Sequence, residues 1–315
     1  MDNEIKYKER IVVMGFGAQG SAQAMNLKDS GRELSVFLRR ESPRNIEARE
    51  AGLLVVNDPR EASAEADVAA LLLPDGEQPG FYREFLEPGL PEGALLVFAH
   101  GFAVHYGEIR LRKDLDAVLA APMAQGAKVR SEFASGRGVP VLLAVAQDAT
   151  GRALERAKAY ARGISRTGPF IETTVREEVE SDLFAEQAVL CGGMPSLVRA
   201  AFDTLVAGGT DPRIAYLCCL RELGAIVSVM ERHGISGLFS RISDTARYGA
   251  ITRGPALVDS GVRERMSVIL EDILSGRFAE ELKEEAARGY PKTKALLAES
   301  AAHPIERIHE EMTKA

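Results

Sequence analysis

The sequence is poor in the residues that mark several common classes of protein. Among its 315 residues it has no tryptophan and three cysteines, Cys191, Cys218 and Cys219. The cysteines lie in apolar sequence without CxxC spacing, which argues against a disulfide framework and indicates a reducing compartment. An excess of positive charge is also absent, since the formal net charge is -7 at pH 7. We therefore expect no nucleic-acid partner.

Long apolar runs are missing as well. The N-terminus, MDNEIKYKER, is charged and has no apolar signal core. No stretch approaches the roughly 20 apolar residues that a membrane helix needs. Hydrophobic residues make up 46% and charged residues 27%, as in an ordinary globular protein. We expect a cytoplasmic protein with no membrane partner, long enough for two domains.

The first half of the chain alternates short apolar runs with stretches of helical composition. Runs that are apolar on both faces are typical of a parallel sheet covered by helices. We expect such strands at 10–14, 34–38, 68–73, 94–99, 117–121 and 139–145. Their alternation with helices predicts a Rossmann-type, doubly wound α/β domain over residues 1–178.

The second half has apolar residues at helical spacing and no strand-like runs. Expected helices cover 183–207, 211–233, 261–274 and 278–287, with glycines between several of them. Residues 179–315 are therefore predicted to form an all-helical domain, and the polar tail after Tyr290 is expected to be loose.

A glycine-rich loop follows the first expected strand. It opens a helix and reads Gly15-Phe16-Gly17-Ala18-Gln19-Gly20. Gly15 permits a tight turn, Gly17 lets the backbone approach a pyrophosphate, and Gly20 allows close packing of strand and helix. An ordinary glycine turn is the alternative, but this context favours dinucleotide binding.

The end of the second expected strand indicates which dinucleotide binds. Sites selective for NAD have an acid there, whereas NADP sites have arginines. Here the strand is followed by Arg39, Arg40, Ser42 and Arg44. Arginine forks and a hydroxyl suit a 2′-phosphate, so we favour NADPH over the alternative of a solvated charged loop.

Two acids at the start of the helical half are candidate metal ligands. Asp182 and Glu186 are spaced i and i+4, so on a helix they share one face. Paired carboxylates suit Mg²⁺, which prefers oxygen ligands. On spacing alone, a solvated acidic face is the simpler interpretation.

Several longer motifs resemble the ketol-acid reductoisomerase family, in the family's order and over roughly residues 8–310. They include GFGAQGSAQAMNLKDSG, LLLPDGEQ, FAHGFAVHYGEI, IETTVREEVESDLFAEQAVLCGG, RISDTARYGA and HPIE. The resemblance implies a Rossmann-type domain, a knotted helical domain, NADPH, and two Mg²⁺. It also implies alkyl migration in an acetohydroxy acid, then reduction of the 2-keto acid, on the route to valine and isoleucine. A homodimer or higher homo-oligomer with shared active sites is implied too.

The resemblance assigns roles to individual residues. The glycine loop, Arg39 and Ser42 match the cofactor site, and Arg44 stands where the family often has another serine. Other positions that match the cofactor side are Leu73, Pro74, Gln78 and His100. His100 also matches the family's active-site histidine.

The remaining matches lie in the helical half. Asp182 and Glu186 match the first pair of metal ligands, and Glu222 matches the second carboxylate of the pair from the partner subunit. Ser243 matches the serine that touches the substrate carboxylate.

Four positions depart from the family. Met123 replaces the lysine of Ala-Pro-Lys, and Arg247 replaces the glutamate of Thr-Ala-Glu-Tyr-Gly. Cys218 and Arg221 replace a metal-binding glutamate and a histidine. The loss of an oxygen ligand should weaken the second Mg²⁺ site. Cys218 could recruit a softer metal, but we favour an inert buried thiol.

These departures lead to our hypothesis of an NADPH-dependent reductase acting on a small 2-keto acid or a related C=O or C=N compound. Its Mg²⁺-dependent migration step is expected to be weakened or lost. One alternative is a working ketol-acid reductoisomerase in which Arg221, Arg247 and Lys128 compensate. Another is a catalytically silent NADP-binding paralogue.

Overall fold

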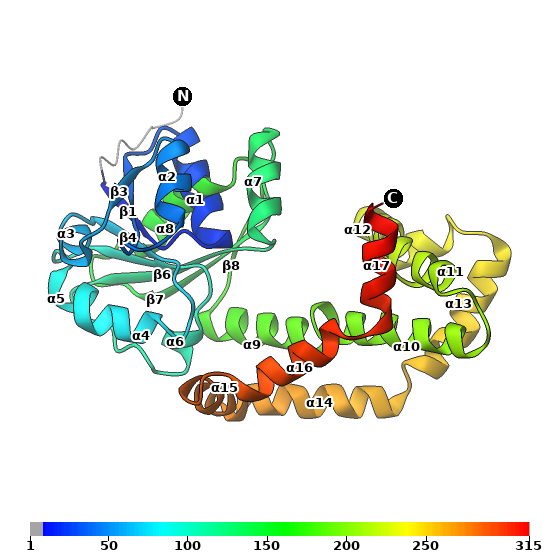
Figure 1. The fold of residues 1–315 in the computed structure, drawn as a ribbon. Helices are drawn as coiled ribbons and strands as arrows, with labels where there is room; N and C mark the ends of the chain where they lie inside the picture. Colours follow the sequence, from blue (N-terminus) through cyan, green and yellow to red (C-terminus); the bar gives the residue numbers. More distant parts are fainter. Residues whose placement is uncertain (1–8, 315) are drawn as a thin grey trace. The chain divides into compact units, whose positions relative to one another are not determined.

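The computed structural model describes residues 9–314 (Figure 1). The chain divides into two compact units, Met1–Ser181 and Asp182–Ala315. The division falls inside helix α9 (Val175–Ala185), whereas the sequence analysis placed the boundary after residue 178.

The first unit is built on an eight-stranded sheet within the described residues, in the order β3-β2-β1-β4-β5-β6-β7-β8. Neighbouring strands are parallel except for the antiparallel pair β6 and β7. The expected doubly wound α/β domain is confirmed, with that one pair as an addition. The strands are β1 (Ile11–Met14), β2 (Leu34–Phe37), β3 (Leu54–Val56), β4 (Val68–Leu71), β5 (Leu95–Phe98), β6 (Asp116–Pro122), β7 (Val141–Gln147) and β8 (Phe170–Glu172).

Helices cover both faces of this sheet. Buried residues of α1 (Ala18–Asp29), α2 (Arg44–Glu50) and α8 (Ala153–Ile164) form one hydrophobic cluster with the strands. Residues of α3 (Pro59–Ala64), the π-helix η1 (Tyr82–Leu86) and α6 (Phe102–His105) form a second cluster. The remaining helices of this unit are α4 (Gln78–Phe81), α5 (Glu87–Gly89) and α7 (Gly126–Ala134).

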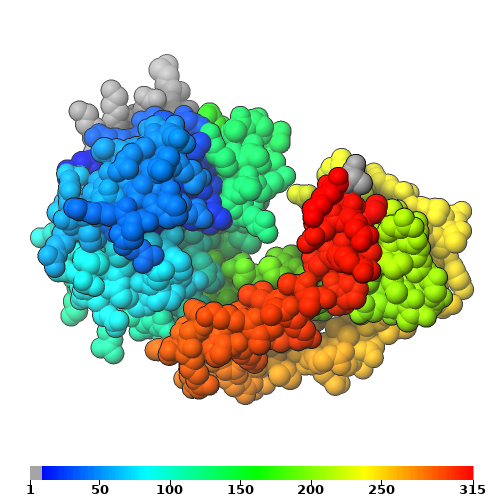
Figure 2. Space-filling view, viewed as in Figure 1, coloured from blue at the N-terminus to red at the C-terminus, as the bar shows by residue number. Residues whose placement is uncertain are grey.

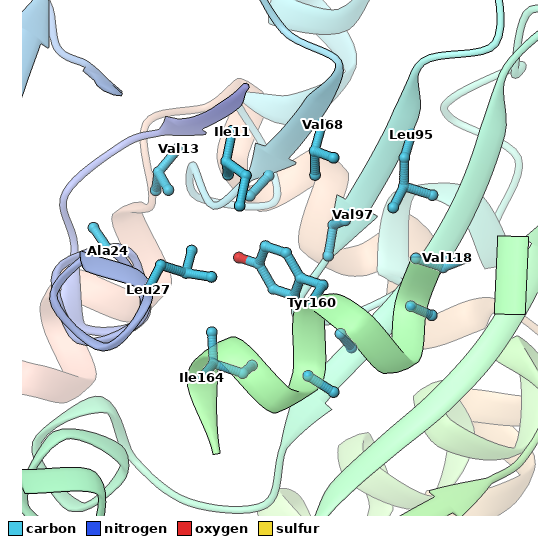
Figure 3. Packing of buried hydrophobic residues seen from close by; sticks show 14 of the residues in the cluster. Ile11, Val13, Ala24, Leu27, Val68, Leu95, Val97, Val118, Tyr160 and Ile164 are labelled. Carbon is cyan, nitrogen blue, oxygen red and sulfur yellow. The ribbon is translucent and has the colours of Figure 1, made fainter. Parts of the chain in front are cut away.

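Tyr160 of α8 shows how the first face is packed. Its ring points into the cluster of strand and helix side chains, with Leu27 and Ile164 nearby (Figure 3). The hydroxyl donates a hydrogen bond to Gln23 Oε1 at 2.8 Å, so the polar tip of the ring is satisfied. Burial raises the pKa of Tyr160, which keeps the phenol neutral.

The described residues of the second unit, 182–314, form helices and no strand, as predicted. After α9 come η2 (Glu186–Leu190), α10 (Gly193–Ala207), α11 (Pro212–Tyr216), η3 (Leu217–Arg221), α12 (Leu223–Phe239), α13 (Asp244–Leu257), α14 (Ser260–Leu274), α15 (Arg277–Ala287), α16 (Pro291–Ala301) and α17 (Pro304–Lys314). The knot implied by the resemblance stays a prediction.

The expectation of a loose tail after Tyr290 is wrong. Pro291 and Pro304 occupy the first positions of α16 and α17, where proline favours helix initiation. Ile305 and Ile308 of α17 are buried against residues of α10 and α11. Figure 2 shows these last helices, in orange and red, on the visible face of the second unit. The pattern was missed because α17 is mostly polar: its packing rests on Ile305 and Ile308, with Met312 partly buried beside them.

One helical run is apolar and long enough to cross a membrane, although the sequence analysis found no such stretch. It covers Val175–Ala207, and 11% of its apolar window is buried. The run begins with the acid-rich helix α9 and is interrupted by the π-helix η2 and the pair Gly192–Gly193. Acidic side chains are unfavourable in hydrocarbon, so length and composition are weak evidence for a membrane span.

A buried ion pair ties α8 to the sheet. Asp116 and Arg156 are 0% and 3% exposed, and Asp116 Oδ2 accepts a hydrogen bond from Arg156 Nη1 at 2.8 Å. The carboxylate also accepts from the Thr150 hydroxyl at 2.7 Å, and the guanidinium donates to Glu9 at 2.9 Å and to the Gly93 carbonyl at 2.8 Å. Burial alone would raise the pKa of Asp116, but hydrogen bonds from Thr150 and Arg156 hold it below its ordinary value.

We expect Arg156→Met to lower the free energy of unfolding by about 3–5 kcal/mol, because it leaves a buried carboxylate without its cation. Arg137→Met is the control: the Arg137 side chain is 64% exposed. Its partner Glu132 keeps a second cation, Lys128, at 2.9 Å, so the loss of Arg137 should change stability little. Urea unfolding followed by circular dichroism measures both. Because the pKa of Asp116 is lowered on folding, its contribution is present above the ordinary value of 3.8 and is lost as the pH falls through the folded value. Equal effects of the two substitutions would contradict this account.

Candidate functional site

A cavity of about 1000 Å³ lies at the carboxyl ends of the central strands. Residues directly after β1, β2, β4 and β5 line it. The strand order reverses between β1 and β4, and open α/β sheets bind ligands at this switch point. The cavity lining brings together the predicted cofactor residues Gly15, Phe16, Gly17, Ala18, Gln19, Arg39, Ser42, Arg44, Leu73, Pro74, Gln78 and His100.

The three glycines of the loop differ in their conformation and in the space around them. Gly15 has a φ of +104°, which disfavours any side chain. A Cβ at Gly20 would lie 2.4 Å from the Gly15 carbonyl oxygen, so Gly20 serves packing and does not line the cavity. A Cβ at Gly17 would meet no heavy atom of the described residues within 4 Å. The space at Gly17 therefore fits the close approach of a pyrophosphate.

Gln19 joins the glycine loop to the segment after β6. Its side-chain amide donates a hydrogen bond to the Ala124 carbonyl at 2.9 Å. A Cβ at Gly126 would lie 2.0 Å from the Ala18 carbonyl oxygen, so α7 begins in direct contact with the start of α1. Met123, which replaces the family's lysine, is the residue before Ala124 and is 49% exposed.

The loop between β2 and α2 is organised by a buried asparagine that the sequence analysis missed. The Asn45 amide donates to the carbonyls of Arg39 and Ser42, each at 2.8 Å. Asn57 in turn donates to Asn45 Oδ1 at 2.8 Å. These bonds hold the arginine-bearing loop in place, and no pattern in the sequence distinguishes Asn45 from a surface asparagine.

The arginines of this loop differ in their contacts. The Arg44 guanidinium donates to the Phe16 carbonyl, so part of its fork is engaged by the backbone. Arg39 Nη2 lies 3.4 Å from a carboxylate oxygen of Glu77, which belongs to the opposite wall of the cavity.

The opposite wall combines an amide with aromatic rings. Buried Gln78 donates to the Leu73 carbonyl at 2.9 Å, and its Oε1 has no hydrogen-bond partner within residues 9–314. The ring centroid of Phe81 lies 5.2 Å from that of Phe37 and 5.2 Å from that of Phe85. An unsatisfied buried acceptor beside an aromatic row fits a ligand with polar groups and a flat ring.

His100 follows β5 and contacts helix α9. Its Nδ1 lies 3.2 Å from Glu178 Oε1, and the Gly101 amide donates to Glu178 Oε2 at 3.4 Å. Glu178 is 3% exposed. A Cβ at Gly101 would lie 3.0 Å from the Val179 side chain, so glycine permits this close packing of α9.

Asp182 lies one turn beyond Glu178 on α9. Potential ligand atoms of His100, Glu178 and Asp182 lie within 4.8 Å of one another. Glu178 was missed by the sequence analysis, although the spacing of Glu178, Asp182 and Glu186 is i, i+4 and i+8 and marks a continued acidic face. The carboxylate-rich donor set fits a hard cation such as Mg²⁺.

A second histidine lies close to this group. His105 Nε2 is 3.5 Å from Glu180 Oε1. Burial lowers the pKa of His105, and the Glu180 carboxylate opposes that shift. The neutral form of His105 is therefore favoured at neutral pH.

The other predicted residues lie on helices of the second unit. Glu186 begins η2, and Glu222 directly follows η3. Ser243 caps α13, where its hydroxyl oxygen accepts a hydrogen bond from the Ala246 amide at 3.2 Å.

Two of the three cations that were expected to compensate for the substitutions, Arg247 and Lys128, contact other groups of the chain. The Arg247 guanidinium donates to the Phe239 carbonyl at 2.6 Å and to Asp244 Oδ1 at 2.9 Å, and thereby joins α12 to α13. Lys128 lies 2.9 Å from Glu132. The expectation that Cys218 is buried is wrong, because this thiol is exposed on η3.

The chain matches known proteins over almost its whole length. Residues 5–168 match the family model described as acetohydroxy acid isomeroreductase, NADPH-binding domain, and residues 175–315 match ketol-acid reductoisomerase, C-terminal domain. A ketol-acid reductoisomerase (NADP(+)) of Kineococcus radiotolerans is 46% identical over 308 residues, which cover 97% of this chain and 90% of that protein.

Solved structures agree with these matches. The structure of an NADH-preferring ketol-acid reductoisomerase from an uncultured archaeon superimposes with a TM-score of 0.96 at 36% identity, covering 100% of this chain and 96% of that one. A semialdehyde dehydrogenase NAD-binding protein from Cupriavidus necator has a TM-score of 0.64 at 20% identity, covers 85% and 99% of the two chains, and shows likeness of fold alone.

A Rossmann-type sheet with a glycine loop at its switch point, joined to a helical unit, defines a nicotinamide-dependent oxidoreductase. Within that class, the chain belongs to the ketol-acid reductoisomerase family.

Two glycines of the loop should respond differently to alanine. Gly17→Ala is expected to leave the melting temperature unchanged or slightly higher, since Gly17 has an extended conformation with open space at its Cβ. The new methyl should weaken NADPH binding by about tenfold or more, because it enters the space of the pyrophosphate.

Gly20→Ala should instead lower the melting temperature, since its Cβ has no room. Thermal unfolding and titration of NADPH fluorescence measure the two effects. Unchanged NADPH affinity in Gly17→Ala would show that the loop does not bind the pyrophosphate.

Proposed function

We propose that this protein is a working ketol-acid reductoisomerase, which converts 2-acetolactate to 2,3-dihydroxy-isovalerate in the cytoplasm. The observation that carries the proposal is the match of both domains to the family, with 46% identity to a relative named for this activity. The comparisons favour this alternative over our earlier hypothesis that the migration step is weakened or lost.

NADPH is the proposed reductant. The cavity is large enough for a dinucleotide, and the space at Gly17 can admit the pyrophosphate. Arg39 and Ser42 line the cavity and are proposed to bind the 2′-phosphate. When bound, NADPH would supply the hydride and Mg²⁺ would polarise the keto oxygen. Of the chain's own groups, the backbone amides of the glycine loop, which lines the cavity, are proposed to hold the pyrophosphate.

Asp182 and Glu186 are proposed to bind Mg²⁺ in the active site of their own subunit. Glu222 is proposed to reach a second Mg²⁺ position in the active site of the partner subunit. Glu178 binds both His100 and the Gly101 amide, so it is proposed to orient the histidine beside the metal carboxylates. His100 can then hold or release a proton on its other ring nitrogen, Nε2. Ser243 retains a hydroxyl proton that it can donate to the substrate carboxylate.

We expect the protein to oxidise NADPH when 2-acetolactate is the substrate, and to do so only when Mg²⁺ is present. The same assay on the already migrated 3-hydroxy-3-methyl-2-oxobutanoate isolates the reduction step. Asp182→Asn should lower Mg²⁺-dependent turnover by at least about 10- to 100-fold while leaving NADPH binding unchanged.

Two results would contradict the proposal. Turnover of the migrated keto acid without turnover of 2-acetolactate would favour a reductase that has lost migration. NADPH binding without turnover of either compound would favour a silent paralogue.

A homo-oligomer is also proposed, from the surface of the second unit. Its helices expose many large apolar side chains, and those more than half exposed include Leu197, Ile235, Leu257, Leu296 and Leu297. Contiguous exposed apolar patches mark interaction surfaces, so we propose that a second copy of the chain covers these helices. A second copy that covers these helices would also explain how the apolar run Val175–Ala207 is tolerated in water.

Sedimentation velocity should therefore give the mass of a dimer or larger assembly. Leu197→Asp on α10 is expected to shift the distribution toward monomer, because a charge would enter the interface. Leu54→Asp, the same change at an exposed leucine of the first unit, should leave the mass unchanged. A monomeric wild-type protein would refute the assembly.

A further inference from the structure

An ion pair connects the two loops that flank the cofactor cavity. Arg39 follows β2, and Glu77 lies in the loop between β4 and α4. Both line the cavity, and Arg39 Nη2 lies 3.4 Å from Glu77 Oε2. The side chains are 67% and 46% exposed, so both can rearrange when a ligand enters.

Glu77 places an anion on the guanidinium proposed to bind the 2′-phosphate of NADPH. A phosphate monoester has a charge of about −1.5 to −2 at pH 7. Bound to Arg39, it would either displace the Glu77 carboxylate or remain beside it as a like charge. The carboxylate therefore disfavours NADPH.

NADH would present a different group to Arg39 and Glu77. Its ribose has a 2′-hydroxyl, which is a hydrogen-bond donor and is recognised in NAD sites by a carboxylate. Glu77 can accept such a bond without leaving Arg39, because a carboxylate has several acceptor positions. The Glu77 carboxylate therefore leaves the affinity for NADH unchanged or increases it.

The other two arginines of this loop do not share the interaction of Arg39 with Glu77. Arg44 is bonded to the Phe16 carbonyl, which engages part of its fork. Arg40 lies partly in a smaller adjoining cavity beside Asp58 and Arg60. Arg39 is the cation of this loop that already holds a carboxylate inside the main cavity.

We propose that Glu77 is a specificity-determining residue that narrows the preference of this site for NADPH over NADH. The inference rests on the proposed function, in which the cavity binds the nicotinamide dinucleotide with its 2′-phosphate at Arg39.

The test compares the dissociation constants of NADPH and NADH for the wild-type protein and Glu77→Gln. Nucleotide fluorescence reports binding without turnover, and the chain has no tryptophan to interfere. Glu77→Gln should bind NADPH about three- to tenfold more tightly and NADH equally or less tightly, as expected for the loss of one partly screened charge. Raising the salt concentration should shrink the NADPH difference.

Two controls identify the cause. Glu47→Gln removes the same charge from an exposed position on α2 outside the cavity lining, and should leave the ratio of the two affinities unchanged. In an Arg39→Gln background, Glu77→Gln should have a smaller effect on NADPH, because the guanidinium for which the two anions compete is gone.

The outcomes separate the two proposals. A wild-type protein that binds neither nucleotide overturns the proposed function and this inference with it. A wild-type protein that binds NADPH, with an unchanged affinity ratio in Glu77→Gln, overturns the inference alone. Melting temperatures of the variants establish that each is folded.

Discussion

Steric contact around the turn between β1 and α1 is the constraint on which the cofactor site depends. Gly20 lies against the Gly15 carbonyl, and Gly126 lies against the Ala18 carbonyl. Neither position has room for a methyl group, so the turn, α1 and α7 are held in one arrangement. The loop can then expose Gly17 to the cavity, and Gln19 can bond to the Ala124 carbonyl. A packing requirement thus fixes where a phosphate can approach.

The residues that depart from the family differ in whether contacts within the folded chain explain them. Arg247 contacts Phe239 and Asp244 and so supports the connection between two helices. Backbone and side-chain oxygens accept hydrogen bonds from this guanidinium. These structural contacts explain the arginine without a role in binding substrate or metal. Met123 and Cys218 are both exposed, so neither is explained by packing in the first or second unit alone.

Much of the fold could be predicted because its signals are local. The apolar runs and the glycine motif specify strands and a turn through neighbouring residues alone. The three-residue strands β3 and β8 were missed because so short a run has no pattern. Asn45 and Glu178 were missed because their roles come from contacts with backbone and side chains distant in sequence. The helices α16 and α17 were missed because the segment is mostly polar and only a few of its residues are buried.

The two π-helices of the second unit have a consequence for how its sequence can change. In η2 the Cys191 amide donates to the Glu186 carbonyl at 2.8 Å, and in η3 the Glu222 amide donates to the Leu217 carbonyl at 3.1 Å. Each wide turn holds one residue more than an α-helical turn and stands beside a predicted ligand position. Deleting that residue would restore regular α-helical winding with little rotation of the helix beyond it, whereas a deletion in a regular turn would rotate everything beyond it by about 100° about the helix axis. Acidic and apolar faces keep their alignment only in the first case, so single-residue deletions should be better tolerated within these two turns than in the regular parts of the same helices.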